Sequence, residues 1–135
     1  MSLELVVVTP EGEKLSEVVD QVVLPGEAGN FGVLESHERF LTPLQPGPME
    51  VQSGGSSRWA ALSSGFAEVN GSRVVVLVDA CSMAADIDRA SVEAERTEAE
   101  TALAALAETK ENAGERARLS VLLTRTQVEL DVVGR

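Results

Sequence analysis

Hydrophobic residues before position 80 come in short runs that are separated by Gly, Pro, Ser and Asn. The runs lie at 3–8, 16–24, 49–51, 58–62, 66–69 and 73–79. They are rich in Val and Leu, and the β-branched residues among them favour extended chain. Asn70-Gly71 between two such runs is a strong hairpin signal. Short strands with frequent turns predict an antiparallel β-sandwich of about ten strands. The run at 73–79, which is apolar throughout 74–78, predicts a strand buried on both faces.

One segment, "LPGEAGNFGVLESHERFLTPLQPG" at 24–47, does not fit this pattern. It holds four glycines, three prolines, two phenylalanines and the single histidine of the chain, His37. Gly and Pro punctuate regular structure, so the segment predicts a long loop and not a strand or helix. Loops on a rigid sheet commonly carry binding residues, which makes this segment a candidate recognition site.

From residue 86 onward the pattern changes to Ala, Glu, Leu and Arg at helical spacing. Asp86 or Asp88 can cap the first helix, since a carboxylate there accepts from free backbone N–H groups. The pattern weakens at 110–114, where Asn112 and Gly114 predict the end of that helix. A second helix is expected over roughly 115–132. The chain therefore predicts a β-then-α fold of the α+β class, with a sandwich at 1–85 and an antiparallel helical hairpin at 86–135.

The charge of the chain limits its partners. Its 135 residues carry a net charge of −11, which disfavours nucleic acid and anionic lipid headgroups because both need a basic surface. The N-terminus lacks the features of a targeting peptide and no apolar run is long enough to span a membrane, so a cytosolic location is expected. The single cysteine, Cys81, predicts a small buried apolar side chain without a disulfide.

Arg116, Arg118 and Arg125 in the second predicted helix form the densest positive feature of the sequence. One interpretation is a solvated face that pairs with the acidic first helix. The other is a docking surface for an acidic partner.

The sequence does not favour catalysis. His37 is the only histidine, and the sequence contains no Ser-x-x-Lys, Gly-x-Ser-x-Gly, HExxH or CxxC motif. The glycines at 26–32 lack the lysine of a phosphate-binding loop. The chain is therefore expected to be a binding or structural protein, with no cofactor or metal.

The order of four segments adds a resemblance. These are "VVVTPEG" at 6–12, "VVLPGEAGNFGVLESHERFLTPLQPG" at 22–47, "SSGFAEVNGSRVVVLVDAC" at 63–81 and "DID" at 86–88. Together they resemble the epsilon subunit of the F-type ATP synthase, called delta in mitochondria, over nearly the whole chain. The pattern G-x-F-G-x-L-x-x-H at 29–37 is the sharpest part.

This resemblance implies a non-catalytic rotor subunit of the central stalk, peripheral on the cytoplasmic side of a bacterial inner membrane. The sandwich would bind the gamma subunit and the c-ring and help couple proton translocation to ATP synthesis. Gly29, Asn30, Phe31, Gly32 and His37 would form the loop that faces the ring. Family members often carry a carboxylate at the position of Asn30, and a Pro-Gly pair at 35–36. Nearby carboxylates that could substitute are Glu27, Glu35 and Glu38.

The resemblance also implies that the hairpin inhibits ATP hydrolysis when it extends toward the alpha and beta subunits, with Arg116, Arg118 and Arg125 meeting acidic segments. Some relatives bind ATP on the folded hairpin through I/L-D-x-x-R-A. Ile87 and Asp88 match this motif, and Arg125 falls near a second-helix arginine.

The motif is incomplete, however, because Ser91 and Val92 stand at the Arg-Ala positions. Weak or absent ATP binding is therefore expected. Three alternatives remain open: a coupling subunit without inhibition, a nucleotide-sensing module, and a generic β-sandwich adaptor with a helical tail.

Overall fold

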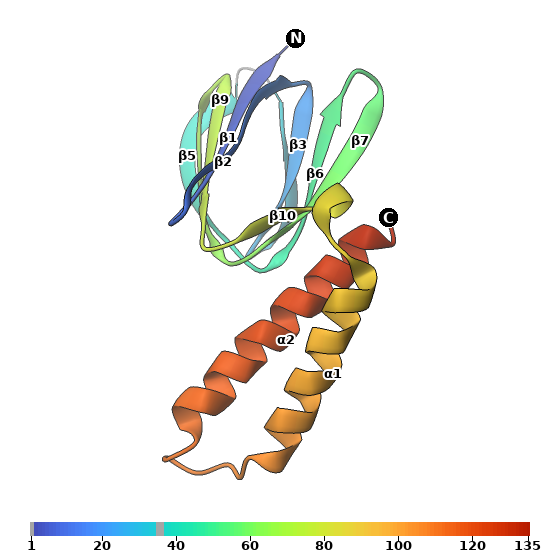
Figure 1. Ribbon diagram of the computed structural model, residues 1–135. Helices are drawn as coiled ribbons and strands as arrows, with labels where there is room; N and C mark the ends of the chain where they lie inside the picture. The colour runs from blue at the N-terminus through green and yellow to red at the C-terminus, as the bar shows by residue number, and fades with distance from the viewer. Residues whose placement is uncertain (1, 35–36) are drawn as a thin grey trace.

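The computed structural model describes residues 2–34 and 37–135, with only the backbone described at His37 and Glu38. Its two parts are a sandwich of strands and a hairpin of two helices that packs against one end of the sandwich (Figure 1). The predicted β-then-α architecture is confirmed.

Ten strands are assigned within the described residues. Their bounds are β1 (Leu3–Thr9), β2 (Gly12–Val19), β3 (Gln21–Gly26), β4 (Gly29–Val33), β5 (His37–Leu44), β6 (Gly47–Ser53), β7 (Ser56–Leu62), β8 (Gly65–Gly71), β9 (Arg73–Val78) and β10 (Cys81–Met83). They form one sheet in the order β10-β7-β6-β3-β5-β8-β9-β1-β2, with β4 added beside β3. Among the strands of the described residues, only β1 and β9 pair in parallel.

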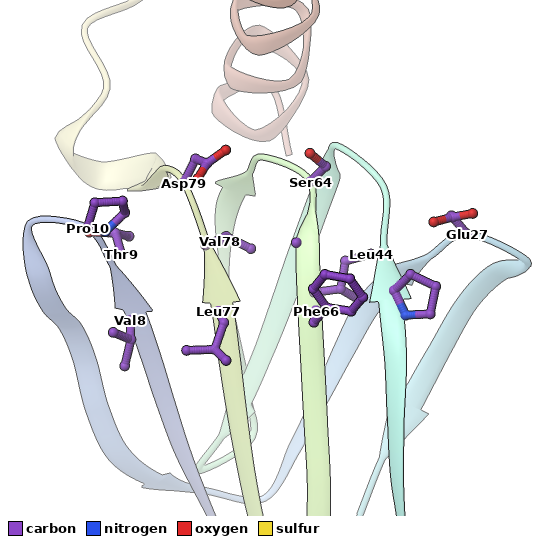
Figure 2. Close-up of a pocket in the computed structure, with 12 residues that line it drawn as sticks. Val8, Thr9, Pro10, Glu27, Leu44, Ser64, Phe66, Leu77, Val78 and Asp79 are labelled. Carbon is purple, nitrogen blue, oxygen red and sulfur yellow. The ribbon is translucent and has the colours of Figure 1, made fainter.

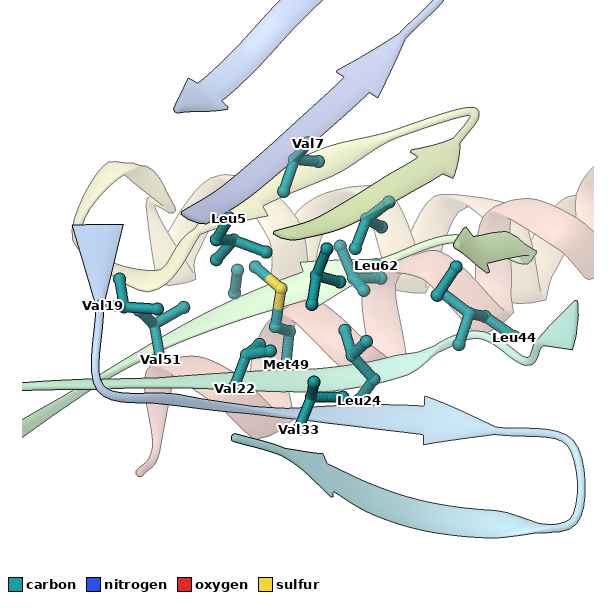
Figure 3. Packing of buried hydrophobic residues seen from close by; sticks show 14 of the residues in the cluster. Leu5, Val7, Val19, Val22, Leu24, Val33, Leu44, Met49, Val51 and Leu62 are labelled. Atoms are coloured by element: carbon teal, nitrogen blue, oxygen red, sulfur yellow. The ribbon is translucent and has the colours of Figure 1, made fainter. Parts of the chain in front are cut away.

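The sheet folds over on itself at the β3–β5 junction, where Gly26 and Leu44 are the one registered pair. This brings two layers face to face and buries the side chains between them. Figure 3 shows Leu5 and Val7 of one layer above Val22, Met49 and Val51 of the other. Aliphatic side chains fill most of this core, as the low aromatic content of the sequence requires.

The predicted hairpin around Asn70-Gly71 is confirmed. Asn70 pairs with Arg73 across the turn from β8 to β9, and Gly71 has a φ of +62°, which glycine adopts without strain.

Two other strand predictions are wrong. The run at 16–24 is divided at Asp20, whose carboxylate accepts a 3.0 Å bond from the Gly54 N–H. Strand β9 alternates between buried and open positions, so only one of its faces is in the core.

The prediction of a long loop at 24–47 is also wrong. Strands β4 and β5 run through it, and β3 extends to Gly26. The prolines are accommodated because their carbonyls still accept: Pro25 O from the Gln45 N–H at 2.9 Å, and Pro43 O from the Glu27 N–H at 3.3 Å.

A short 3-10 turn, η1 (Ala84–Asp86), leads into helices α1 (Arg89–Ala105) and α2 (Ala113–Val133). Asp88 caps α1 by accepting from the Ala90 N–H at 3.2 Å, which confirms one of the two predicted caps. Gly114 was expected to stop a helix but lies inside α2. The alanines at helical spacing do not all face inward, because Ala90, Ala94 and Ala105 of α1 are exposed while Val92 and Ala99 are buried.

Candidate partner-binding surfaces

A row of apolar side chains crosses the outer face of the sandwich. Pro43 of β5, Phe66 of β8, Leu77 of β9 and Val8 of β1 are consecutive partners in the register of these four strands. We call these four residues the apolar row. Figure 2 shows Val8, Leu77 and Phe66 side by side on neighbouring strands. Phe66 is 52% exposed and Leu77 46%, so the row presents large apolar groups to solvent.

The apolar row borders a shallow hollow of about 630 Å³ at the end of the sandwich that faces the helices. Thr9, Pro10, Ser64 and Asp79 line its upper edge, and Glu27 lies at its side (Figure 2). Farther along β5, Leu41 points to the same outer face as Pro43 and is 65% exposed. A continuous exposed apolar surface of this kind marks a site of protein association.

Strand β4 carries most of the residues predicted to face a ring. Gly29, Asn30 and Gly32 are exposed, and among the described strands β4 pairs only with β3. It is therefore an edge strand with little side-chain bulk, which lets a partner approach its backbone. Phe31 is different: it is half-buried against the core and meets Phe40 edge to face at 6.0 Å between ring centroids.

The structure does not bring His37 together with Gly29 and Asn30. Asn30 pairs with Pro25 at the start of β4, whereas the His37 backbone pairs with Gly71 at the start of β5, after β4 has run its full length. The predicted loop is thus split between two ends of the sandwich. The Glu35 position and the side chains of His37 and Glu38 lie outside the described residues.

The three arginines of α2 all have partners within the folded hairpin. Arg116 donates to the carbonyl oxygens of Leu106 at 2.6 Å and Leu103 at 3.2 Å, so it caps the C-terminus of α1. Arg118 pairs with Glu115 at 2.5 Å in solvent. In the folded hairpin each of the three arginines is already paired with an acceptor of the same chain. Both interpretations, a solvated paired face and a docking surface, start from this paired state.

Arg125 joins the two helices and a buried carboxylate. It contacts Glu95 of α1 at 2.7 Å and Glu129 of α2 at 2.6 Å. The sequence analysis did not single out Glu129. The sequence signal that could have identified it is spacing, because positions 119, 126 and 129 fall on one face of a helix. Leu119, Thr126 and Glu129 are all buried.

The residues of the incomplete nucleotide motif do lie together. Ile87, Asp88, Ser91 and Val92 line a hollow of about 320 Å³ between η1, α1 and β10. Its acidic lining residues are Asp86, Asp88 and Glu129, and Lys14 is its one basic lining residue within the described chain. Arg125 does not line it, and the Asp88 carboxylate is occupied by the Ala90 N–H and the Ser91 hydroxyl. This hollow offers poor charge complementarity to a triphosphate.

Potential catalytic or metal-binding groups are sparse. Cys81 is half-buried against the core, and burial raises the pKa of its thiol, which keeps it protonated and unreactive. No cluster of three metal-ligating side chains occurs in residues 2–34 and 39–135. Neither helix of the described chain is long and apolar enough to cross a membrane. The fold and its exposed apolar surface define a β-sandwich module suited to binding other proteins.

Comparisons with known proteins agree with this class. The profile of the "ATP synthase, Delta/Epsilon chain, beta-sandwich domain" matches residues 2–84. An ATP synthase epsilon chain of Anaeromyxobacter dehalogenans is 38% identical over 135 residues, covering 100% of both chains. One from Herpetosiphon aurantiacus is 38% identical over 98% of this chain and 94% of its own length.

Solved structures share the fold. A chain in the Euglena gracilis mitochondrial ATP synthase, described as OSCP/F1/c-ring, superposes with a TM-score of 0.79 at 23% identity, covering 99% of this chain and 82% of that one. A chain from the Tetrahymena thermophila central stalk and c-ring gives 0.56 at 14% identity, covering 95% and 97%.

The chain belongs to the delta/epsilon family of ATP synthase chains. It aligns from end to end with epsilon chains, which are non-catalytic subunits of the central stalk of the F1 complex. The prediction that the chain is not itself an enzyme is therefore confirmed.

Proposed function

We propose that this chain couples rotation of the central stalk to ATP synthesis by binding the gamma subunit through the apolar row. The observation that carries the proposal is the in-register exposure of Phe66 and Leu77 beside Pro43 and Val8. Apolar anchors at the centre of an interface contribute most of its binding free energy. A torque-transmitting joint also needs a rigid base, which the closely packed core behind the row provides.

The second proposed contact is with the c-ring, through the exposed edge of β4. Its glycines, Gly29 and Gly32, allow close backbone approach, and Asn30 supplies an exposed amide. Glu27, exposed in the turn before β4, is the nearest described carboxylate that could replace the acidic residue of other family members. These contacts would place the chain at a bacterial inner membrane without insertion into it.

The third proposed element is a brake on ATP hydrolysis formed by the hairpin. In the folded state Arg116, Arg118 and Arg125 are held by partners of the same chain. Extension would free Arg116 and Arg125 from their partners on α1 and bring all three arginines to acidic segments of the alpha and beta subunits, so the folded hairpin is the inactive form of the brake. ATP is proposed to bind weakly or not at all, because the hollow at Ile87 and Asp88 is acidic.

The deciding experiment measures ATP hydrolysis by a matching catalytic core that lacks this subunit. The full chain, or a version that ends at Ala85, is added back. All core residues of the sandwich lie before residue 79, so the shorter version keeps them. If both bind through gamma and only the full chain slows hydrolysis, the sandwich is the dock and the hairpin is the brake.

Other outcomes select among the alternatives. If both versions bind and neither inhibits, the chain is a coupling subunit without a brake. If neither binds, it is a β-sandwich adaptor with some other partner. Calorimetry of the isolated chain with millimolar ATP tests the nucleotide-sensing alternative, since tight binding would contradict the proposed weak site. His37→Ala tests the ring contact: unchanged c-ring binding and coupling would restrict that contact to β4.

A further inference from the structure

Glu129 is a carboxylate placed where the helical hairpin meets the sandwich. Its side chain is 8% exposed. It lies between two hollows, one lined by α2 and the turns at Ser63 and Asp79, the other by η1, β10 and the start of α1. Acidic side chains are rarely buried unless they are paired, so this position needs an explanation.

The negative charge of Glu129 is only partly compensated by its partners. Arg125 donates to Glu129 at 2.6 Å and also to Glu95 at 2.7 Å, so two carboxylates share one guanidinium. Ser82 of β10 adds a neutral hydrogen bond to Glu129. With both acids ionised, the cluster of Glu95, Arg125 and Glu129 keeps one excess negative charge at the interface.

Other ionisable groups face the same region from every packed element. They are Asp79 after β9, Cys81 of β10, Lys14 of β2, Asp86 of η1 and Asp88 before α1. Cys81 stays neutral because burial raises the pKa of its thiol. Three of the remaining four groups are acids, so they reinforce the excess negative charge near Glu129.

We propose that the cluster of Glu95, Arg125 and Glu129 is a proton-operated latch, which holds the hairpin more firmly against the sandwich when Glu129 carries a proton. A proton on Glu129 removes the excess charge, leaves Arg125 paired with Glu95, and keeps an oxygen for Ser82. This inference concerns the isolated chain and does not depend on the proposed partners.

The direction of the pH effect follows from linkage. Burial raises the pKa of Glu129 and the Glu95 carboxylate adds to this, while Arg125 and the Ser82 hydrogen bond oppose it. The net shift of the pKa is upward. When the hairpin leaves the sandwich, Glu129 regains water and its ordinary pKa. The docked state therefore binds the proton more tightly. Docking is strengthened as pH falls toward the raised pKa and weakened as pH rises through it.

The test is amide hydrogen exchange of the full-length chain at a series of pH values from about 4.5, the ordinary range of a glutamate, to about 8, corrected for the intrinsic rates at each pH. Amides of α2 report undocking of the hairpin, and amides of β9 in the same sample report global unfolding. The wild-type chain is expected to show stronger α2 protection at the lower pH, relative to β9. In Glu129→Gln this pH dependence is lost. The matched control is Glu115→Gln, an exposed acid of the same helix, which retains it.

A second variant keeps the proposal testable if Glu129→Gln folds poorly. In Glu95→Gln, Arg125 serves Glu129 alone, so the pH dependence of α2 protection should shrink and protection at the higher pH should rise. The proposal is overturned if α2 protection in the wild-type chain does not change with pH, or if Glu129→Gln and Glu95→Gln keep the wild-type profile. None of these results bears on whether the sandwich binds gamma.

Discussion

The guanidinium of Arg135 lies 4.4 Å from the centroid of the Trp59 ring, so the last residue of the chain, two positions after α2, packs on strand β7 of the sandwich. A cation over an indole face is attracted by the ring quadrupole. Since Trp59 is the only tryptophan of the sequence, its fluorescence reports this contact directly. The contact ties the C-terminal end of the hairpin to the sandwich.

Arg135→Ala is expected to weaken docking of the hairpin by about 0.5–1 kcal/mol, because the cation–π contact is lost. The measurements are the emission of Trp59 and the exchange of α2 amides. Arg135→Lys should retain part of the effect, and Arg96→Ala, an exposed arginine of α1, should leave both signals unchanged. Wild-type emission in Arg135→Ala would show that the contact is absent in solution.

Arg116 gives a second prediction, because it caps α1 from the opposite helix. Arg116→Ala leaves the carbonyls of Leu103 and Leu106 without this donor, and is expected to cost about 1–2 kcal/mol of hairpin stability. Faster amide exchange in the last turn of α1 measures it. Arg118→Ala is the matched control, since its pair with Glu115 lies in solvent and should add nothing measurable.

The two arginines also separate stability from function. If the hairpin is a brake, Arg118→Glu should reduce inhibition of ATP hydrolysis while leaving the folded hairpin intact. Full inhibition by Arg118→Glu would remove Arg118 from the proposed contact with the alpha and beta subunits.

Local sequence signals predicted the turn at Asn70-Gly71 well, since Gly71 has a positive φ that glycine adopts without strain. They failed at 24–47, where the prolines suggested a loop. Pro25 and Pro43 occupy positions at which only their carbonyls are needed, so pairing between distant strands overrides the local preference. The order of the strands, including the parallel β1–β9 pair, has no signal within any short window of the sequence.

The binding surfaces were predictable to different degrees. The residues of β4 were identified by their pattern, but their separation from His37 depends on strand register. The apolar row could not be found, because Pro43, Phe66, Leu77 and Val8 come from four strands that register brings together. Arg116 was identified for its charge, yet its partners Leu103 and Leu106 depend on how the hairpin closes.

The apolar row gives a fourth prediction. Phe66→Ser and Leu77→Ser should each weaken binding of the gamma subunit by about 1–3 kcal/mol, because they remove anchors from the centre of the proposed interface. The melting temperature should change little, as both side chains are about half exposed. Titration of gamma against each variant measures the affinity.

Val18→Ser is the control for this prediction. Val18 is 63% exposed and lies at the other end of β2 from the residue that pairs with Val8. The Val18→Ser variant should bind the gamma subunit with wild-type affinity. Equal weakening by all three variants would mean that the loss is not specific to the apolar row.

Two glycines give the last prediction, with opposite signs. A Cβ on Gly65 would overlap the carbonyl oxygen of Leu77 and lie 2.9 Å from the Cα of Val78. Backbone atoms cannot move aside, so Gly65→Ala should destabilise the sandwich by at least about 2 kcal/mol. A Cβ on Gly114 would meet nothing within 4 Å, and Gly114→Ala should stabilise α2 by about 0.5 kcal/mol because alanine favours helix.

Urea unfolding followed by circular dichroism distinguishes the two glycine variants, since the midpoint should fall for Gly65→Ala and stay level or rise for Gly114→Ala. The pair separates two reasons for a glycine: close packing of β8 on β9 at Gly65, and a position inside α2 that does not require glycine at Gly114. A stable Gly65→Ala chain would mean that β8 and β9, the strands that carry Phe66 and Leu77 of the apolar row, can separate at this end. A destabilised Gly114→Ala chain would mean instead that α2 begins after residue 114, as the sequence alone suggested.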